Sequence, residues 1–357
     1  MYNTNIISKQ LLKWYSKYQR DLPWRHTKDP YKIWLSEIML QQTQVETVIP
    51  YYMKWLDKYP TLKNVAEANE TILLKSWEGL GYYNRCRNFK KAATNIMKEH
   101  EGQIPTDYDY FIKMPGVGEY IAAAVLSIAH DQSHPALDGN IIRVMSRFLK
   151  RKKLSPYNRK IIKNHVQMWM EFGGSPGDIN QALMDIGSQV CKPNQANCYK
   201  CPLENSCMAR KTDSPEIYPS SKLKKQIPNY DVVTGIIWKN DKLLILQRDE
   251  KNHLGGLWEF PGGKMKNGES HVQTLTREIK EECGFDVDVQ SKIGSIKHIY
   301  SHFSIKMTSF HCVSKNNSTL NTTQPYKWIK PAQIKDLPFP KANHKLFAIL
   351  NKQGWHV

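Results

Sequence analysis

The sequence predicts a protein of two parts, an all-α unit followed by an α+β unit. Up to about residue 207, apolar residues recur at three- and four-residue spacing, as in Ile33, Trp34 and Ile38, which is typical of amphipathic helices. A polar, basic stretch with three prolines, residues 211–230, then indicates a linker. Beyond it, short apolar runs separated by turn residues predict strands around a helix.

The composition limits the classes of function. The chain has 357 residues, 40% of them hydrophobic, and a formal net charge of +18. This excess of positive charge indicates a polyanionic partner, nucleic acid first, although a merely basic globular protein has the same charge. No apolar run approaches the roughly 18 residues of a membrane span. The polar start, Met1 to Arg20, differs from a signal peptide, so we expect a cytoplasmic protein, associated with the nucleoid in a bacterium.

A helical hairpin is expected near the middle of the helical part. Residues Thr106–Lys113 and Glu119–Ala129 read as two helices joined by the tight turn Pro115–Gly118. Glycine lets the backbone turn sharply, and the free N–H groups at the start of the second helix suit a phosphate. A plain turn between two helices is the alternative interpretation.

Four of the seven cysteines lie in one short segment with the spacing C-x6-C-x2-C-x5-C. Four thiolates so close together can hold a [4Fe–4S] cluster or a zinc ion, and two disulfides are disfavoured in a reducing compartment. The spacing favours the cluster, because zinc sites usually combine two C-x2-4-C pairs and only one is present. The predicted ligands are Cys191, Cys198, Cys201 and Cys207.

The second part is expected to begin with a hairpin and to contain one central helix. Asn240–Asp241 separates the first two strands. The expected elements are strands Val232–Trp238, Lys242–Gln247, Ile296–Tyr300 and Phe303–Cys312 and a helix over about Ser270–Cys283.

The helix of this second part carries a complete Nudix box, G-x5-E-x7-R-E-U-x-E-E-x-G-U with U apolar, from Gly263 to Phe285. Glu278, Glu281 and Glu282 share one helix face at spacings of three and four residues. Clustered carboxylates repel one another unless a hard cation binds them, so Mg²⁺ is a possible ligand here. A solvated acidic helix face is the alternative.

Three motifs in order, Met114–Tyr120, Leu137–Asn140 and the cysteine segment, resemble the helix-hairpin-helix DNA glycosylases with an iron–sulfur loop. Leu22–Arg25 and Ser36–Thr43 are similar to adenine DNA glycosylases of the MutY type. The resemblance implies a helix-hairpin-helix glycosylase domain over 1–213, with a six-helix part over about 30–136 and a cluster part over 1–29 and 137–213. A linker over 214–229 and a Nudix-like recognition domain over 230–357 complete the chain.

The resemblance also implies the reaction, which is removal of adenine mispaired with 8-oxoguanine or guanine. Breaking an N-glycosidic bond requires protonation of the base and stabilisation of positive charge on the sugar, which two carboxylates in different surroundings can divide. Glu37 lies in an apolar helical stretch that should raise its pKa, so it matches the general acid. Asp138 fits a helix N-cap and matches the family's aspartate at the sugar. Tyr120 stands where bifunctional relatives carry a lysine, which implies no strong lyase activity, and with Asn140 it is expected to position Asp138 or water.

The remaining predictions concern the residues that contact DNA. The base must be extruded and the gap filled, for which Gln41, Gln42 and Tyr82 are candidates. The hairpin turn Gly116-Val117-Gly118 is expected to bind phosphate. Tyr300-Ser301-His302 resembles the family's Phe-Ser-His loop, whose serine reads the oxidised guanine. The resemblance thus implies a monomer that binds duplexes with A:8-oxoguanine or A:G mismatches, and no membrane.

Two other functions stay open. The Nudix box is usually degraded in these relatives and is intact here, so a nucleotide pyrophosphatase fused to a DNA-binding module is the alternative. We favour recognition over hydrolysis, because a motif on a fold does not fix its function. A bifunctional glycosylase-lyase is disfavoured by Tyr120.

Overall fold

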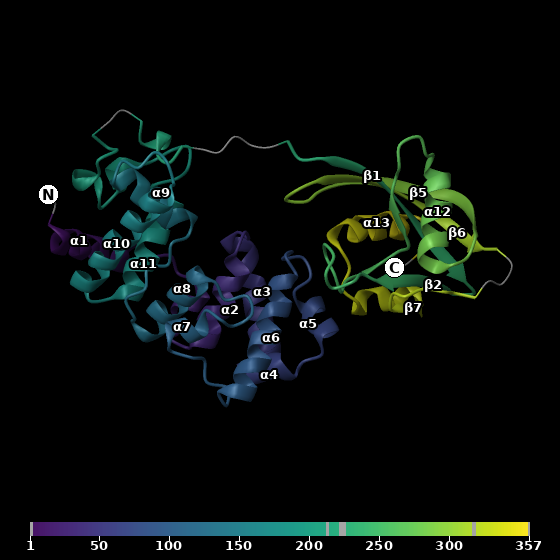
Figure 1. The fold of residues 1–357 in the computed structure, drawn as a ribbon, viewed down its shortest axis with the longest axis horizontal. Coiled ribbons are helices and arrows are strands. Elements are labelled where there is room, and N and C mark those ends of the chain that lie inside the picture. Colours follow the sequence, from purple (N-terminus) through teal and green to yellow (C-terminus); the bar gives the residue numbers. More distant parts are fainter. Residues whose placement is uncertain (1–2, 212–213, 221–225, 316–318, 356–357) are drawn as a thin grey trace. The chain divides into compact units, whose positions relative to one another are not determined.

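The computed structural model describes residues 3–211, 214–220, 226–315 and 319–355. The chain divides into two compact units, Met1–Glu67 with Asn88–Leu223, and Ala68–Arg87 with Lys224–Val357. The first is built of helices, and the second contains a β-sheet (Figure 1). The predicted all-α and α+β characters of the two parts are confirmed.

Helices form the frame of the first unit. It contains α1 (Thr4–Tyr18), α2 (Pro30–Leu40), α3 (Val45–Lys58), α4 (Leu62–Glu67), α7 (Tyr108–Phe111), α8 (Glu119–His130), α9 (Gly139–Phe148), α10 (Pro156–Gly173) and α11 (Pro176–Asp185). Helix α6 (Asn84–Glu99) crosses the boundary between the units, and α5 (Glu70–Ser76) belongs to the second.

Two of these helices show how the sequence sets a helix start. Asp29 precedes Pro30, and its side chain accepts a hydrogen bond from Tyr31 N at 2.9 Å. Ser155 precedes Pro156 and accepts from Asn158 N at 3.2 Å. A polar N-cap followed by proline satisfies a free N–H and supplies the helical φ, so the starts of α2 and α10 are fixed locally.

Helix α2 is the central helix of the first unit. It packs against α3 and α8, and it is buried over most of its length. Trp34 meets Phe89 and Phe111 edge to face, with ring centroids 4.7 and 5.3 Å apart. Because α2 is apolar on nearly all sides, any polar side chain on it is removed from water.

A second core lies under the N-terminal helix. Helix α1 packs against α10 and α11, so the start of the chain joins residues that follow the hairpin. Its core includes Ile7, Leu11, Met145 and Trp169. The segment that carries the cysteines is attached to this core through Leu203.

The hairpin between α7 and α8 has the expected glycine turn. Gly116 has φ +77°, and a Cβ at this position would lie 2.7 Å from Cβ of Asn88. The first helix is shorter than predicted. The Asp107 side chain caps its start, accepting from Tyr110 N at 2.8 Å, and tight turns end it after Phe111.

The second unit is built on a sheet with strand order β3-β2-β1-β6-β5, in which β4 pairs with β1 and β7 with β2. Strands β1 and β6 are parallel, and the other pairs are antiparallel. The strands are β1 (Asn229–Lys239), β2 (Lys242–Gln247), β3 (Trp258–Glu259), β4 (Gly262–Lys264), β5 (Val287–Ile299), β6 (Ser304–Ser314) and β7 (Tyr326–Ile329).

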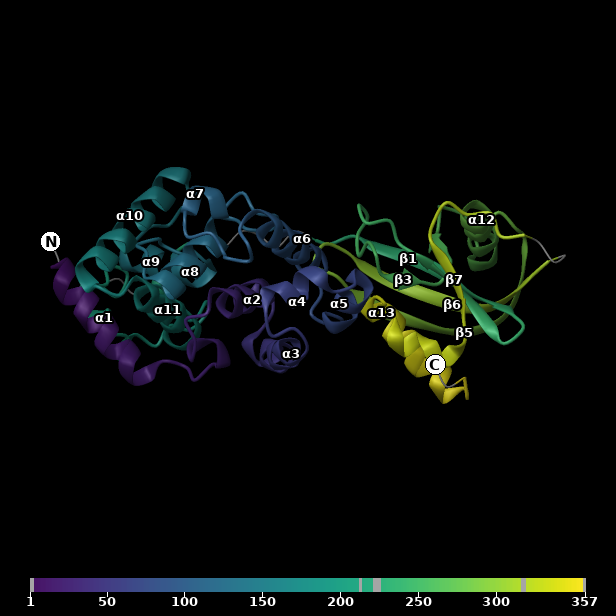
Figure 2. The ribbon, with the colours of Figure 1, turned by 90° about the horizontal axis from the view of Figure 1, so that it is seen from below.

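A helix covers each face of this sheet. Figure 2 shows α12 (His271–Cys283) on one side and α13 (Lys341–Lys352) on the other. The alternation along β2 explains the two cores, since Leu244 packs with α12 residues and Leu243 with α13 residues. The predicted β1–β2 hairpin and central helix are confirmed, with Asn240 at φ +58° in the turn and Ser270 capping α12.

Residues 68–87 group with the sheet-containing unit, although they lie between helices of the first unit in the sequence. One contact inside this unit is the hydrogen bond from Phe339 N to Glu78, at 2.8 Å. No helix within the described ranges is long and apolar enough to cross a membrane.

Candidate active site

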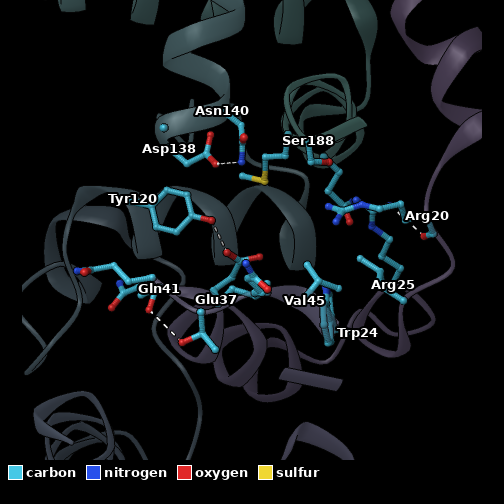
Figure 3. Close-up of a pocket in the computed structure, with 18 residues that line it drawn as sticks. Arg20, Trp24, Arg25, Glu37, Gln41, Val45, Tyr120, Asp138, Asn140 and Ser188 are labelled. Atoms are coloured by element: carbon cyan, nitrogen blue, oxygen red, sulfur yellow. Dashed lines mark hydrogen bonds between the residues drawn. The ribbon is translucent and has the colours of Figure 1, made fainter. Parts of the chain in front are cut away.

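A cavity of about 660 Å³ lies in the first unit, between α2, the start of α8 and the start of α9. Its lining includes all four residues predicted to act on the substrate, Glu37, Tyr120, Asp138 and Asn140 (Figure 3). These residues are far apart in the sequence, and the packing of α2 against α8 brings the first two together.

Glu37 is the buried acid of this cavity. Only 5% of its surface is exposed, and Tyr120 Oη donates a hydrogen bond to its carboxylate. Burial, together with the nearby charge of Asp138, raises the pKa of Glu37 to about 7, against the opposing effect of the hydrogen bond from Tyr120. A carboxyl with this pKa is protonated in a large fraction of molecules at neutral pH, so it can give a proton to a base.

Asp138 caps α9 on the opposite side of the cavity. Its carboxylate accepts from Ile141 N at 2.6 Å and from Asn140 Nδ2 at 2.7 Å, which confirms the predicted N-cap. Burial raises the pKa of Asp138 above its usual value, and these hydrogen bonds limit the rise. Two donors and the helix N-terminus therefore favour the ionised form, unlike the surroundings of Glu37.

Arg143 supports this second carboxylate indirectly. Its guanidinium donates to Asn140 Oδ1 at 2.8 Å, to Gly187 O at 2.7 Å and to Cys191 O at 2.9 Å. A chain of hydrogen bonds thus leads from Asp138 to the backbone of the cysteine segment. Arg143 was not predicted as a site residue. Its place on the polar side of an amphipathic helix that begins directly after Asp138 could have indicated this role.

A buried aspartate fixes the arginines at another wall of the cavity. Asp185 accepts from Arg25 at 2.6 and 2.9 Å and from Arg20 Nε at 2.7 Å, and its side chain is fully buried. Arg20 and Arg25 line the cavity, and the charge of Arg25 lowers the pKa of Glu37 slightly. The contact between Arg25 and Asp185 was not predicted either, because 160 residues separate them in the sequence.

The predicted DNA-contacting residues fall in different places. Gln41 and Gln42 line the cavity beside Glu37, with Gln42 at φ +59°. Tyr82 belongs to the second unit, where its hydroxyl forms a hydrogen bond with that of Ser301. The gap-filling and lesion-reading roles assigned to these residues stay predictions.

The four cysteines surround one small cavity, which Val190, Ala196 and Pro215 complete. Arg147 is 2% exposed and donates to Cys191 Sγ at 3.3 Å and to Lys192 O at 2.8 Å. Arg147 forms no salt bridge among the described residues, although its charge lowers the pKa of Glu216, so thiolate ligands would add negative charge beside this buried cation. The donor set therefore fits an anionic metal–thiolate centre.

Within the described ranges, no three His, Cys, Asp or Glu side chains are placed to hold one metal ion. A zinc site requires four ligands within about 2.3 Å of one centre, whereas a cluster spreads its ligands around a larger group. The choice of a cluster over zinc stays the prediction made from the cysteine spacing.

Arg277 binds the carboxylates of the Nudix box. It donates to Glu269 at 2.7 Å and to Glu278 at 2.8 Å, and it lies 3.3 Å from Glu281. Burial raises the pKa of Glu282 to about 7, opposed by a hydrogen bond from Gly262 N. The Mg²⁺ site stays a prediction of the sequence, since the described carboxylates form no ready metal site.

The segment Tyr300-Ser301-His302 forms the tip of the β5–β6 hairpin, as the flanking strand pattern predicted. Tyr300 N donates to Phe303 O at 2.8 Å, and the two rings lie 4.9 Å apart. His253 packs edge-on against both rings. The aromatic group holds the tip while Ser301 and His302 stay exposed.

Comparison with known proteins agrees with this arrangement. Residues 35–170 match the HhH-GPD superfamily of base excision DNA repair proteins, and residues 232–348 match the NUDIX domain. An adenine DNA glycosylase of Buchnera aphidicola subsp. Acyrthosiphon pisum is 34% identical, over 84% of this chain and 84% of that protein. Another, of Buchnera aphidicola subsp. Schizaphis graminum, is 30% identical over 96% of this chain and 98% of that one.

Among solved structures, that of a thermostable thymine-DNA glycosylase is similar, with a TM-score of 0.54 and 27% identity over 59% of this chain and 97% of that chain. The similarity to the Buchnera enzymes extends over both predicted parts. The chain therefore belongs to the adenine DNA glycosylases, enzymes of base excision repair, and carries a NUDIX domain fused after its helical domain.

Proposed function

We propose that this enzyme excises adenine paired with 8-oxoguanine or guanine by hydrolysis, after extruding the base from the duplex. The observation that carries the proposal is the pairing of Glu37 and Asp138 across one cavity, where Asp138 accepts more hydrogen bonds than Glu37. A cavity of about 660 Å³ is within the range of small-molecule sites and accommodates a purine nucleoside.

Glu37 acts as the general acid in this proposal. Its proton passes to a ring nitrogen of adenine as the bond from the base to the sugar breaks, so the base leaves as a neutral molecule. Tyr120 Oη donates to the carboxylate and becomes its stabilising partner once the proton has gone. A pKa near 7 matches the acid to neutral pH.

Asp138 stabilises the positive charge that develops on the sugar. Its ionised form is held by Ile141 N and by Asn140 Nδ2, and Arg143 fixes the orientation of the Asn140 amide. A fixed negative charge in a site shielded from water is worth more than one in solution. Water then adds to the sugar, and without a lysine at position 120 we propose no strong strand-nicking step.

We further propose that Cys191, Cys198, Cys201 and Cys207 hold a [4Fe–4S] cluster. The cluster would supply a structural cross-link for a segment too small to form its own core. The domain boundaries at 213/214 and 229/230, the monomeric state, and lesion reading by Tyr300-Ser301-His302 belong to the same proposal.

The test is adenine release from duplexes that carry adenine opposite 8-oxoguanine, guanine or thymine, with and without alkali treatment. We expect release at the first two pairs, strand breaks only after alkali, and a loss of at least about 100-fold in Glu37→Gln. Release opposite thymine at the same rate would contradict the mismatch specificity. No release by metal-replete protein would sink the proposal and leave the Nudix box as the site to assay.

A further inference from the structure

A second cavity, of about 320 Å³, lies in the first unit beside the candidate active site. Tyr120 lines both cavities. On this side the walls come from the start of α8, from the segment before Asp138, and from one face of α10. The residues that line it include Tyr108, His134, Leu137, Arg159, Lys160 and Lys163.

Three cations of α10 give this cavity its charge. Arg159, Lys160 and Lys163 lie at spacings of one, three and four residues, which puts them on one face of the helix, and all three are exposed. The ion pairs found among the described residues include none of them. Glu119 also lines the cavity, and the charge of Asp109 acts on Tyr108 and His134, so two carboxylates oppose the three cations and one positive charge is left.

The floor of the cavity is flat and partly apolar. The Tyr108 and His134 rings stack with centroids 4.6 Å apart and an interplanar angle of 29°. Burial and the charge of Lys163 both lower the pKa of His134, which places Lys163 close to the ring. Lysine ammonium groups above a rigid, flat wall suit an extended chain of sugars and phosphates better than a compact ligand.

The cavity continues the DNA-facing surface that the proposed function requires. Leu137 lines it and Asp138 lines the active-site cavity, so adjacent residues border the two. The hairpin turn that ends at Gly118 leads directly into Glu119, which lines the second cavity. A DNA strand with one nucleotide against Asp138 and one phosphate on the hairpin turn therefore passes the second cavity.

We propose that Arg159, Lys160 and Lys163 bind backbone phosphates of the DNA strand that carries the extruded adenine. This inference rests on the proposed function, because it uses the position of the extruded nucleotide. The contacts are independent of base sequence and contribute to affinity and register, not to the chemical step.

The test compares two full-length, metal-replete double variants that remove equal charge. Lys160→Ala/Lys163→Ala removes two lysines of the cavity, and Lys9→Ala/Lys13→Ala removes two exposed lysines of α1 that line none of the three cavities described. Affinity for an A:8-oxoguanine duplex is measured from 50 to 300 mM salt, each variant also carrying Glu37→Gln so that the duplex stays intact.

We expect the slope of log K against log salt to fall by about two for the cavity variant, with affinity about tenfold weaker at low salt, and by much less for the control. Lys160→Arg/Lys163→Arg should restore the slope. Phosphate-ethylation interference should locate the lost contacts next to the adenine nucleotide.

Equal slopes for the cavity and control variants would overturn the inference, and so would lost contacts that map to the opposite strand. Failure of the proposed function has a different signature. In that case the protein without substitutions releases no adenine, whatever the salt dependence of its binding.

Discussion

At the scale of single residues, Glu37 and Asp138 show how surroundings divide the work of two similar groups. Glu37 lies on the most buried helix of the first unit and receives one hydrogen bond from Tyr120. Asp138 receives donations from Ile141 N and from the Asn140 amide at the start of α9. The first arrangement favours a proton on the carboxyl, and the second favours a charge.

The buried acid makes stability depend on pH. The pKa of Glu37 rises from 4.5 to about 7 on folding, so between these values the folded protein keeps a proton that the unfolded chain has lost. Below about pH 4.5 the neutral carboxyl costs the folded state nothing. As the pH rises from 4.5 through 7, the folded protein loses stability, because only the unfolded chain gives up this proton freely. Glu37→Gln avoids the loss, so relative to the unchanged protein it should gain about 3 kcal/mol between pH 4.5 and 8.5.

Urea unfolding of the two proteins at several pH values measures this difference. The exposed Glu101→Gln serves as the control, since its side chain lies in water before and after unfolding. A stability difference between Glu37→Gln and the unchanged protein that does not vary with pH would contradict the buried-acid assignment.

Tyr120→Phe separates the hydrogen bond from the shape of the ring. The Tyr120 hydroxyl stabilises ionised Glu37, so its removal should raise the Glu37 pKa further, by roughly one unit. The alkaline limb of the pH profile of single-turnover adenine release should then move to higher pH. If the limb stays in place while the rate drops at every pH, Tyr120 acts on the substrate and not on Glu37.

At the scale of elements, the hairpin before α8 offers two glycines with different requirements. Gly116 has φ +77°, and a Cβ there would meet Asn88 at 2.7 Å, whereas Gly118 has φ −99° and open space around it. Gly116→Ala should therefore lower the free energy of unfolding by about 1–3 kcal/mol and weaken duplex binding. Gly118→Ala should leave the stability within about 0.5 kcal/mol.

Thermal unfolding and duplex affinity of the two alanine variants test this pair. If Gly116→Ala destabilises the protein as little as Gly118→Ala, then Asn88 moves to make room for a Cβ at Gly116, and the turn does not depend on glycine.

Local elements were predictable from the sequence because their signals are local. The Asp138 cap, the β1–β2 hairpin and the helix after Ser270 are each set by residues within a few positions. The Arg25–Asp185 pair and the support of Asn140 by Arg143 depend on how α9, α11 and the N-terminal segment pack. No periodicity or spacing reports such contacts, so the sequence analysis missed them.

The shorter α7 has a related cause. The helix was predicted over Thr106–Lys113, but the Asp107 side chain caps it so that it begins at Tyr108, and the turns toward Gly116 use the backbone groups that follow Phe111. The resemblance to glycosylases supplied the roles of Glu37 and Tyr120, since the residues around Glu37 alone are equally typical of a paired glutamate in a helix.

At the scale of the whole molecule, chemistry and lesion reading are assigned to different compact units. The acid, the aspartate and the cysteines lie in the first, and the hairpin tip with Ser301 lies in the second. The grouping of residues 68–87 with the second unit puts Tyr82 beside Ser301. The residue proposed to fill the gap in the duplex and the residue proposed to read the opposite base therefore belong to one unit.

This division predicts that discrimination and catalysis can be altered separately. Ser301→Ala removes an exposed hydroxyl, so the preference for 8-oxoguanine over guanine opposite adenine should fall about five- to tenfold, the equivalent of one hydrogen bond. Single-turnover release of adenine opposite guanine should stay unchanged, since no group of the active-site cavity is touched. Ser304→Ala, the same change three residues later, should leave the preference as it is.

Tyr82→Phe distinguishes direct reading from positioning, because it removes the hydrogen-bond partner of Ser301 and keeps the serine. If Ser301 reads the lesion itself, Tyr82→Phe should retain most of the preference that Ser301→Ala loses. If both variants lose it equally, the serine acts by holding Tyr82, and lesion recognition belongs to the tyrosine. If neither variant changes the ratio of single-turnover rates, measured with protein in excess of the duplex but below saturation, the second unit reads the opposite base through other residues.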